Sequence, residues 1–349
     1  MLWVGVDVGG TFTDIVVYDD QSGAVSAGKS PSTPSEPSEG VVNALKQLSV
    51  DLVKVSIFRH GATVATNTAL ERKGAELGVI TTQGFRDVLI IGRGNRTQLY
   101  DIKAVRPAGL VKRSRVLEVP ERVGPDGEII TSMDEAAVIA ATSRLRELGV
   151  EAIAVCFLHS YANPEPEREA VKLVERTWPD IPVCNSADVL AEHREYERFS
   201  TTALNAYVAP RMSGYLNDLA ANLSAQGLTA TPEVMSSSGG SWPLSEMARL
   251  PVNSMLSGPA GGVTGAVEFA RTIGINDIIT YDMGGTSTDT CLIRSGRYAL
   301  TNDGMLGGLP NRAPALEINT VGAGGGSLAY LDHGGFPNVG PPPAGTRPG

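Results

Sequence analysis

The chain has 349 residues, of which 42% are hydrophobic and 19% are charged, and its formal net charge at pH 7 is -9. This length and composition predict a globular protein with two domains, and the acidic balance without any basic run argues against nucleic acid as a partner. No stretch approaches the roughly 20 apolar residues of a membrane span, and the first residues lack the basic segment of a signal peptide. We therefore expect a cytoplasmic protein without membrane contact.

The first predicted element is a β-hairpin whose sequence returns far downstream. The pattern Asp-x-Gly-Gly-Thr-x-Thr-Asp comprises Asp7, Gly9, Gly10, Thr11, Thr13 and Asp14 in its first copy, and Asp282, Gly284, Gly285, Thr286, Thr288 and Asp289 in its second. In both copies a β-branched run leads into the Gly-Gly step and a Thr-rich run leads out. This arrangement predicts a tight turn between two strands.

Each of these turns is suited to bind an anion. Glycine permits positive φ, so the turn can bring consecutive backbone N–H groups and threonine hydroxyls around a phosphate. Two such turns facing each other would clamp the phosphates of one nucleotide. Asp7 and Asp282 would supply carboxylates that hold a metal ion through water or orient an attacking group. Plain Gly-Gly turns are also common, but the repetition favours the phosphate site.

After the first hairpin we expect a third strand at residues 24–29 and a helix at residues 38–48. A literal Walker A pattern spans residues 23–30, but Pro31 follows it directly. A phosphate-binding loop of that type must open a helix, and the Pro/Ser-rich run that follows cannot form one. The Walker A match is therefore rejected.

The next segments mix regular elements with a long irregular stretch. A helix at residues 65–73 and a strand at residues 77–81 come first. Residues 92–126 are rich in turns and arginines, and we favour a solvated excursion over a substrate lid for them. A capping box at residues 132–135 opens a helix that ends at Gly149.

The following strand predicts the fold class of the first half. Residues 152–158 are apolar throughout, as expected of a strand that is buried on both faces. A helix at residues 164–178 and a strand at residues 181–184 continue the alternation. The pattern is typical of an α/β fold.

The character of the sequence changes near Ser186. Residues 193–227 form one long helical region, which we expect Pro210 to interrupt. We therefore expect one domain at residues 1–185, carrying the first hairpin, and another at residues 186–349, carrying the second.

The second domain combines short strands with glycine-rich turns. A strand at residues 233–236 precedes the segment LSGPAGGV, which opens a helix. Free N–H groups at the positive end of that helix offer another anion site, and close helix packing is an equally good explanation of its small residues. A strand at residues 277–281 leads into the second hairpin. The Gly/Pro-dense tail has no closing element, so we expect the front part of a longer enzyme, with the second lobe incomplete.

The paired hairpins resemble those of the superfamily of sugar kinases, heat-shock chaperones and actin. Within it, the chain is most similar to the hydantoinase A/5-oxoprolinase family, through segments that include VDVGGTFTDIVVYD, HGATVATNTALERKGA, GFRDVLIIGRGNR, REYERFSTTALNAY, LSGPAGGV, YDMGGTSTD and VGAGGGSLA. The resemblance implies an α/β, ribonuclease-H-like (actin-like ATPase) fold whose two lobes close on ATP. The family's adenosine-binding part is expected to be missing from these residues.

The resemblance also implies a reaction. Ring-opening members of the family phosphorylate the oxygen of a cyclic amide such as 5-oxoproline or a hydantoin, which makes the ring carbon electrophilic enough for water. Related carboxylase subunits phosphorylate the oxygen of an enolisable ketone, or bicarbonate. Both types need a hydantoinase B-type subunit or domain. The implied cofactors are ATP and Mg²⁺ or Mn²⁺.

Residue roles follow from positions in the matching motifs. Asp7 and Asp282 are the expected catalytic and metal-binding residues. The expected ATP-binding residues are Gly9, Gly10, Thr11, Thr13, Gly284, Gly285, Thr286 and Ser287. The expected substrate residues are His60, Thr63, Asn67, Arg93 and Arg96, although His60 is equally compatible with a structural role and the two arginines with plain exposure.

The expected function is an ATP-dependent cyclic-amide hydrolase, or the N-terminal portion of one, acting on a small molecule. A subunit of an ATP-dependent acetone or acetophenone carboxylase is the alternative within the family. An actin-like or chaperone-like protein would use the same clamp to switch conformation, and the absence of a long peptide-binding β domain from the sequence argues against it. A plain sugar kinase is a further alternative, and it would form ADP in the presence of a sugar without a partner subunit.

Overall fold

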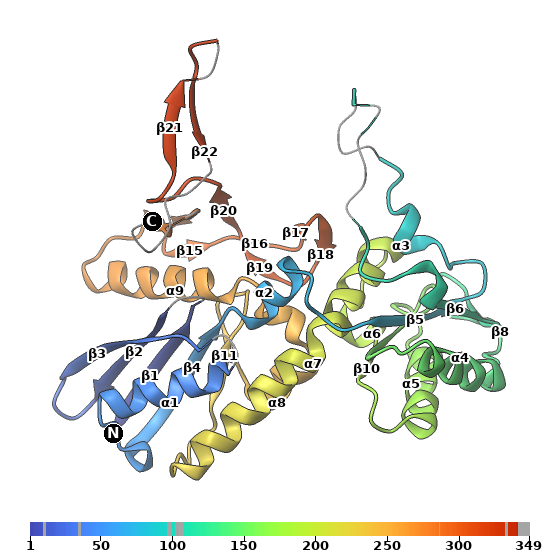
Figure 1. Ribbon diagram of the computed structural model, residues 1–349, viewed down its shortest axis with the longest axis horizontal. Coiled ribbons are helices and arrows are strands. Elements are labelled where there is room, and N and C mark those ends of the chain that lie inside the picture. The colour runs from blue at the N-terminus through green and yellow to red at the C-terminus, as the bar shows by residue number, and fades with distance from the viewer. Residues whose placement is uncertain are drawn as a thin grey trace.

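The computed structural model describes residues 1–9, 12–33, 36–95, 100–101, 103, 108–285, 287–331 and 334–340 (Figure 1). Its first sheet orders the strands β12-β11-β4-β1-β2-β3. These are β1 (Leu2–Val8), β2 (Phe12–Asp19), β3 (Val25–Pro31), β4 (Val55–Ala62), β11 (Glu233–Met235) and β12 (Ser241–Pro243). Strand β1 runs antiparallel to β2 and parallel to β4, and β11 joins β4 in parallel. This arrangement is the ribonuclease-H-like one expected from the sequence.

Alternating apolar residues build the core beneath this sheet. In β1, Val4, Val6 and Val8 are buried while their neighbours are exposed, as the two-residue period of a strand requires. Helix α1 (Pro37–Gln47) and the long helix α7 (Glu195–Ala225) contribute apolar residues to the same core cluster. The short helices α2 (Val64–Leu70) and α8 (Leu244–Arg249) complete it.

A second sheet is inserted between β4 and β11 and lies on the right in Figure 1. Its parallel strands are ordered β10-β9-β5-β6 and comprise β5 (Leu77–Thr82), β6 (Val116–Val119), β9 (Ala152–Cys156) and β10 (Val183–Asn185). One core cluster joins it to α4 (Glu135–Glu147) and α5 (Glu165–Thr177), and another joins it to α3 (Val88–Ile91) and the first turns of α7. Covering helices explain why β5 and β9 are buried throughout.

The third sheet holds the second hairpin. It joins β13 (Ile278–Met283), β14 (Thr288–Arg294), β15 (Arg297–Tyr298) and β20 (Ile318–Val321), and helix α9 (Ser257–Thr272) packs on one of its faces. The opposite face exposes Ile279, Tyr281 and Leu292.

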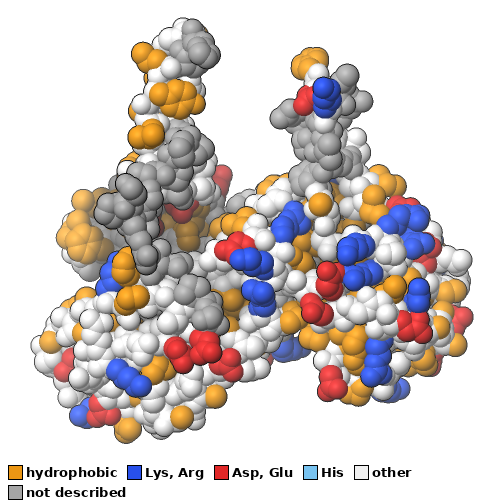
Figure 2. Space-filling model, in the orientation of Figure 1, with side chains coloured by type: hydrophobic (Ala, Val, Ile, Leu, Met, Phe, Trp, Pro, Cys, Tyr) orange, Lys and Arg blue, Asp and Glu red, His pale blue; other side chains and the backbone are white. Residues whose placement is uncertain are grey.

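Short elements complete the described chain. The remaining helices and strands are α6 (Ser186–Val189), β7 (Arg122–Val123), β8 (Ile129–Thr131), β16 (Leu300–Thr301), β17 (Gly304–Leu306), β18 (Leu309–Asn311), β19 (Ala315–Leu316), β21 (Leu328–Leu331) and β22 (Pro337–Gly340), with 3-10 turns at Leu52–Lys54, Arg113–Arg115 and Pro251–Ser254. The β21–β22 hairpin projects from the body and carries exposed apolar side chains (Figure 2). No helix in the described ranges is long and apolar enough to cross a membrane.

The α/β prediction is confirmed, but three local expectations were wrong. Helix α7 continues through Pro210, because buried side chains on both sides hold it against the core. Helix α4 is capped by Asp134, which accepts from the Ala137 N–H at 3.0 Å, so the capping box at 132–135 does not form. Residues 92–126 are not a solvated excursion throughout, since β6 is an edge strand of the second sheet with Val116 and Val119 buried.

The expected division near residue 186 stays a prediction about domain organisation. The first sheet draws β1 to β4 from before this point and β11 and β12 from after it. Helix α7 also packs against both the first and the second sheet. The two parts of the chain therefore share one structural framework.

Candidate functional site

The two copies of the repeated motif adopt the same hairpin geometry. The Gly9 N–H donates to the Phe12 carbonyl at 2.9 Å, and the Gly284 N–H donates to the Ser287 carbonyl at the same distance. Across the strands, Asp7 is opposite Asp14, and Asp282 is opposite Asp289. The repeat in sequence is therefore a repeat in structure.

The buried hydroxyl of the second threonine in each motif stabilises its turn by a hydrogen bond to a neighbouring loop. Thr13 is fully buried, and its hydroxyl donates to Ser32 Oγ at 3.1 Å, because the Ser32 hydroxyl itself donates to the Gly9 carbonyl at 2.8 Å. Thr288 is also buried and donates to the Ala323 carbonyl at 2.6 Å. This corrects the expectation that Thr13 contacts a nucleotide, since its hydroxyl supports the turn from the protein side.

The Asp7 carboxylate experiences negative charge from both hairpins. Burial raises the pKa of Asp7, and the negative charges of Asp14 and Asp282 raise it further. Solvent still reaches Asp7, although protein atoms surround most of its carboxylate. Because Asp14 and Asp282 belong to different hairpins, both turns face one electrostatic environment.

Two glycines leave room for the Asp7 carboxylate. A Cβ on Gly61, which pairs with Asp7 across β1 and β4, would lie 2.6 Å from Asp7 Oδ1. A Cβ on Gly258, in the first turn of α9, would lie 4.0 Å from the same atom. The positive end of α9 therefore lies beside Asp7, where it can also favour a bound anion.

The expected acceptor-side residues lie in different places. Thr63 donates to the Val8 carbonyl at 3.1 Å, and Asn67 donates to Thr63 Oγ1 at 3.3 Å, so both lie beside the end of β1. His60 is fully buried and its Nε2 contacts the Tyr215 hydroxyl on α7. Burial lowers the pKa of His60 to about 4, so the ring is neutral. His60 is therefore a buried core residue, as in the structural role that the sequence left open.

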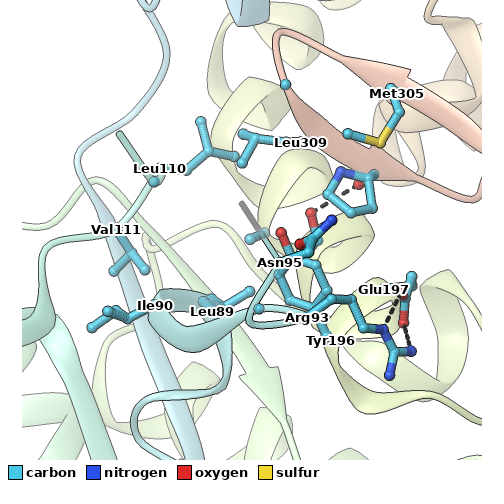
Figure 3. Close-up of a pocket in the computed structure, with 16 residues that line it drawn as sticks. Leu89, Ile90, Arg93, Asn95, Leu110, Val111, Tyr196, Glu197, Met305 and Leu309 are labelled. Atoms are coloured by element: carbon cyan, nitrogen blue, oxygen red, sulfur yellow. Dashed lines mark hydrogen bonds and ion pairs between the residues drawn. The ribbon is translucent and has the colours of Figure 1, made fainter. Parts of the chain in front are cut away.

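Arg93 lies apart from the hairpins, on the wall of a cavity of about 570 Å³. Its guanidinium binds the Glu197 carboxylate through both oxygens, with an Nε to Oε1 distance of 2.7 Å (Figure 3). This bond raises the pKa of Arg93. The structure therefore places Arg93 in a pocket, paired with a partner 104 positions away in sequence.

The remaining site predictions concern the second hairpin and residues outside the description. The Gly325 and Gly326 N–H groups donate to the Gly284 and Gly285 carbonyls, both at 2.9 Å, so the glycine-rich loop after β20 braces this turn. The predictions on Gly10, Thr11, Thr286 and Arg96 lie outside the described residues.

Asp7 and Asp282 suit a divalent cation that is held mainly through water. A cation between them would relieve the repulsion that raises the pKa of Asp7. In the described part of the chain, no group of three or more His, Cys, Asp or Glu side chains is arranged to hold a metal ion. Mg²⁺ is commonly bound by one or two carboxylates together with waters and substrate phosphates, so this donor set fits it.

Sequence reasoning missed Gly61, Gly258, Ser32 and Glu197. Gly61 and Gly258 fall in the motif-like segments HGATVATN and LSGPAGGV, and their place in these segments is the signal that could have found them. Their closeness to Asp7 is seen only in the structure. Ser32 lies in a Pro/Ser-rich loop, and nothing in its sequence context indicates a contact with Gly9.

Two protein-family models match the chain. The model described as hydantoinase/oxoprolinase N-terminal region matches residues 3–178, and the one described as hydantoinase/oxoprolinase matches residues 198–349. The caprolactamase subunit alpha of Pseudomonas jessenii is 36% identical over 99% of this chain and 51% of its own length. The 5-oxoprolinase of Saccharomyces cerevisiae is 32% identical over 99% of this chain and 30% of its own length.

Two solved structures are similar over nearly the whole chain. The ATP-dependent caprolactamase from Pseudomonas jessenii has a TM-score of 0.90 at 35% identity, and nucleotide-free acetone carboxylase has a TM-score of 0.82 at 30% identity. Each match covers 99% of this chain and 51% of the other. The chain therefore spans about half the length of these relatives.

Proposed function

Because the chain belongs to the hydantoinase/oxoprolinase family, we propose that it forms the phosphate-binding part of an enzyme that uses ATP to activate the carbonyl oxygen of a cyclic amide. The observation that carries the proposal is the pair of equivalent hairpins, of which the second places the Asp282 charge where it raises the pKa of Asp7 in the first. The caprolactamase relative is described as ATP-dependent, which supports the choice of nucleotide.

The proposed reaction balances as a phosphoryl transfer followed by hydrolysis. The lactam oxygen attacks the γ-phosphorus of ATP, a P–O bond to the β-phosphate breaks, and ADP leaves. Water then adds to the activated ring carbon and the C–N bond of the ring breaks, which leaves an acyl phosphate with a free amine. A second water hydrolyses the acyl phosphate and releases phosphate and the ring-opened carboxylate. An unactivated amide resists water, so the phosphorylation supplies a leaving group at oxygen.

We assign phosphate binding, metal binding and positioning of the turn to different residues of the site. The N–H groups of Gly9 and Gly284 bond within their hairpins. The other N–H groups of the two turns and the start of α9 would hold the phosphates, because glycine-rich turns and helix N-termini are suited to bind anions. Asp7 and Asp282 would hold Mg²⁺ or Mn²⁺, which would neutralise charge on the phosphate oxygens. Thr63 bonds the end of β1 and Asn67 bonds Thr63, so these two residues would hold the first turn in position.

A partner subunit belongs to the proposal. The caprolactamase relative is named as a subunit alpha, and the acetophenone carboxylase relative of Aromatoleum aromaticum, 32% identical over 99% of this chain, is named as a gamma subunit. We propose a hydantoinase B-type polypeptide or domain as the partner of this chain.

The test is lactam-dependent ADP formation by the complete enzyme with its partner. We expect ε-caprolactam, 2-pyrrolidinone, 5-oxoproline or a hydantoin to stimulate ADP release. Asp7→Asn and Asp282→Asn should each reduce kcat by about 100-fold or more while thermal unfolding stays unchanged, because electrostatic groups at a phosphoryl transfer contribute on this scale. Asp277→Asn, which removes a carboxylate directly before the strand that carries Asp282, is the matched control, and its amide oxygen can still accept from the Ser295 N–H. Normal turnover in both site variants would contradict the assigned roles.

The carboxylase alternative is supported by the structural match to acetone carboxylase. It predicts that bicarbonate with acetone or acetophenone stimulates ADP formation while lactams do not. The same assay therefore separates the two candidates.

A further inference from the structure

The cavity beside Arg93 lies between helix α3, the first turns of α7 and the β17–β18 hairpin. Its walls are mainly apolar, and the residues that form them include Leu89, Ile90, Leu110, Val111, Met305 and Leu309. Its volume of about 570 Å³ is in the range of small-molecule sites. An apolar ring of lactam size would be desolvated here.

A short helix connects this cavity to the first phosphate hairpin. Helix α2 begins after Thr63, which bonds the end of β1, and Arg72 just beyond its end donates to the Gly307 carbonyl at 3.1 Å. Gly307 lies in the turn between β17 and β18, whose Gly308 and Leu309 form the cavity wall. Seven helical residues span about 10 Å. The cavity wall is thus tied to the hairpin over one helix length.

The charge in this cavity is balanced. Among the lining residues that the structure describes, Arg93 is the one cationic side chain, and Glu197 engages it through two bonds. In Figure 3 the guanidinium reaches towards Glu197 and away from the apolar side chains Leu110, Met305 and Leu309. Asn95 and Tyr196 are polar residues on the same wall, of a kind that can bond an amide (Figure 3).

We infer that this cavity is the acceptor site and that it selects uncharged, apolar lactams over carboxylate-bearing ones such as 5-oxoproline. The inference rests on the proposed function. A carboxylate entering the cavity would meet an arginine already neutralised by Glu197, and the lining residues that the structure describes offer no second cation to replace its hydration. A neutral ring loses little hydration and gains the apolar contact.

The test compares two substrates that differ in one group. 2-Pyrrolidinone and 5-oxoproline share the same five-membered lactam, and only the latter carries a carboxylate. With the complete enzyme and its partner, we expect kcat/KM for ADP formation to be at least about tenfold higher for 2-pyrrolidinone, which corresponds to about 1.4 kcal/mol.

Glu197→Gln releases the charge of Arg93 and should shift the kcat/KM ratio towards 5-oxoproline by about tenfold. Glu195→Gln is the matched control, because it removes a neighbouring negative charge and leaves the Arg93 ion pair in place. Leu309→Trp, which fills the cavity, should raise the KM for ε-caprolactam more than the KM for the smaller 2-pyrrolidinone.

The outcomes separate the inference from the proposed function. A higher kcat/KM for 5-oxoproline in the unmodified enzyme, or an unchanged substrate ratio in Glu197→Gln, overturns the inference and leaves the lactam-dependent ATPase intact. An unchanged KM for ε-caprolactam in Leu309→Trp removes the cavity as the acceptor site. Absence of ADP formation with every lactam overturns the proposed function together with the inference.

Discussion

The carboxylate of Asp7 occupies the space that a side chain at position 61 would need. A Cβ there would lie 2.6 Å from Asp7 Oδ1, so Gly61→Ala must turn the carboxylate away. The displaced atom is the end of a side chain, so the fold should tolerate the change. We expect kcat for ADP formation to fall about 100-fold, since misplacement by about 1 Å costs this much.

The control for this variant lies in the neighbouring strand. Gly5→Ala adds a methyl group where no atom lies within 4 Å, so activity and thermal unfolding should both be retained. If Gly61→Ala keeps more than half of the activity, the position of the Asp7 carboxylate is not critical.

His60 makes the stability of the fold sensitive to acid. Its pKa is about 4 in the folded protein and 6.5 ordinarily, so between these pH values only the unfolded chain binds the proton. The free energy of unfolding therefore falls as the pH drops from 6.5 to 4, by about 2 kcal/mol at pH 5. Above pH 6.5 this contribution is fully present.

Urea unfolding at pH 7.5 and pH 5 measures the contribution of His60. Between the two pH values, the free energy of unfolding of His60→Gln should fall by about 2 kcal/mol less than that of the unmodified protein, because glutamine does not titrate. His193→Gln, at an exposed position, should keep the original difference. An equal loss of stability in His60→Gln and the unmodified protein would show that His60 is not held neutral.

Some site residues could be predicted from sequence and others could not. Asp7 and Asp282 are marked by a repeated motif, which reports local backbone geometry. Which face of β4 the side chain of His60 takes depends on the packing of α7, and the partner of Arg93 lies 104 positions away. Neither relation leaves a local pattern in the chain.

At the scale of elements, each phosphate hairpin depends on a buried threonine hydroxyl. Thr13→Val leaves the Ser32 hydroxyl without its donor, and Thr288→Val leaves the Ala323 carbonyl without its own. We expect each variant to lower the free energy of unfolding by about 1 kcal/mol, the usual net contribution of one hydrogen bond, because Ser32 and Ala323 are only partly buried. Urea denaturation measures this loss.

A surface threonine in the same sheet is the reference for these variants. Thr290 donates to the Asn319 carbonyl at 3.1 Å in an exposed position, where water can replace the bond. Thr290→Val should therefore cost less than about 0.5 kcal/mol. Equal losses at Thr288 and Thr290 would argue against a special role for the buried hydroxyl.

Element prediction succeeded where the signal was periodic and failed where packing decided. The strand at 77–81 and the buried strand at 152–158 were recognised as β5 and β9 from their apolar runs. Pro210 was expected to interrupt the helical region, but burial of α7 against two cores outweighs one lost backbone bond. Strand β6 was missed because it is short and lies within an arginine-rich segment.

At the scale of the whole molecule, the fold brings together hairpins that begin 275 positions apart, at Asp7 and Asp282. The insertion of a second sheet between β4 and β11 separates them in sequence, while α9 returns the chain to the first sheet beside Gly61. The α/β class could be predicted from alternating elements. The pairing of β11 with β4 could not, because the insertion between them hides their adjacency.

Convergence of the two hairpins on one site is the central claim, and the pKa of the Asp7 carboxyl measures it most directly. In a ¹³C NMR titration, Asp282→Asn should lower the pKa of Asp7 towards its ordinary value of 3.8, because it removes a negative charge from the other hairpin. Asp14→Asn should lower it as well, and Asp289→Asn, which removes a charge that does not act on Asp7, should not. An unchanged Asp7 pKa in Asp282→Asn, with the Asp14→Asn shift intact, would show that the hairpins do not share a site.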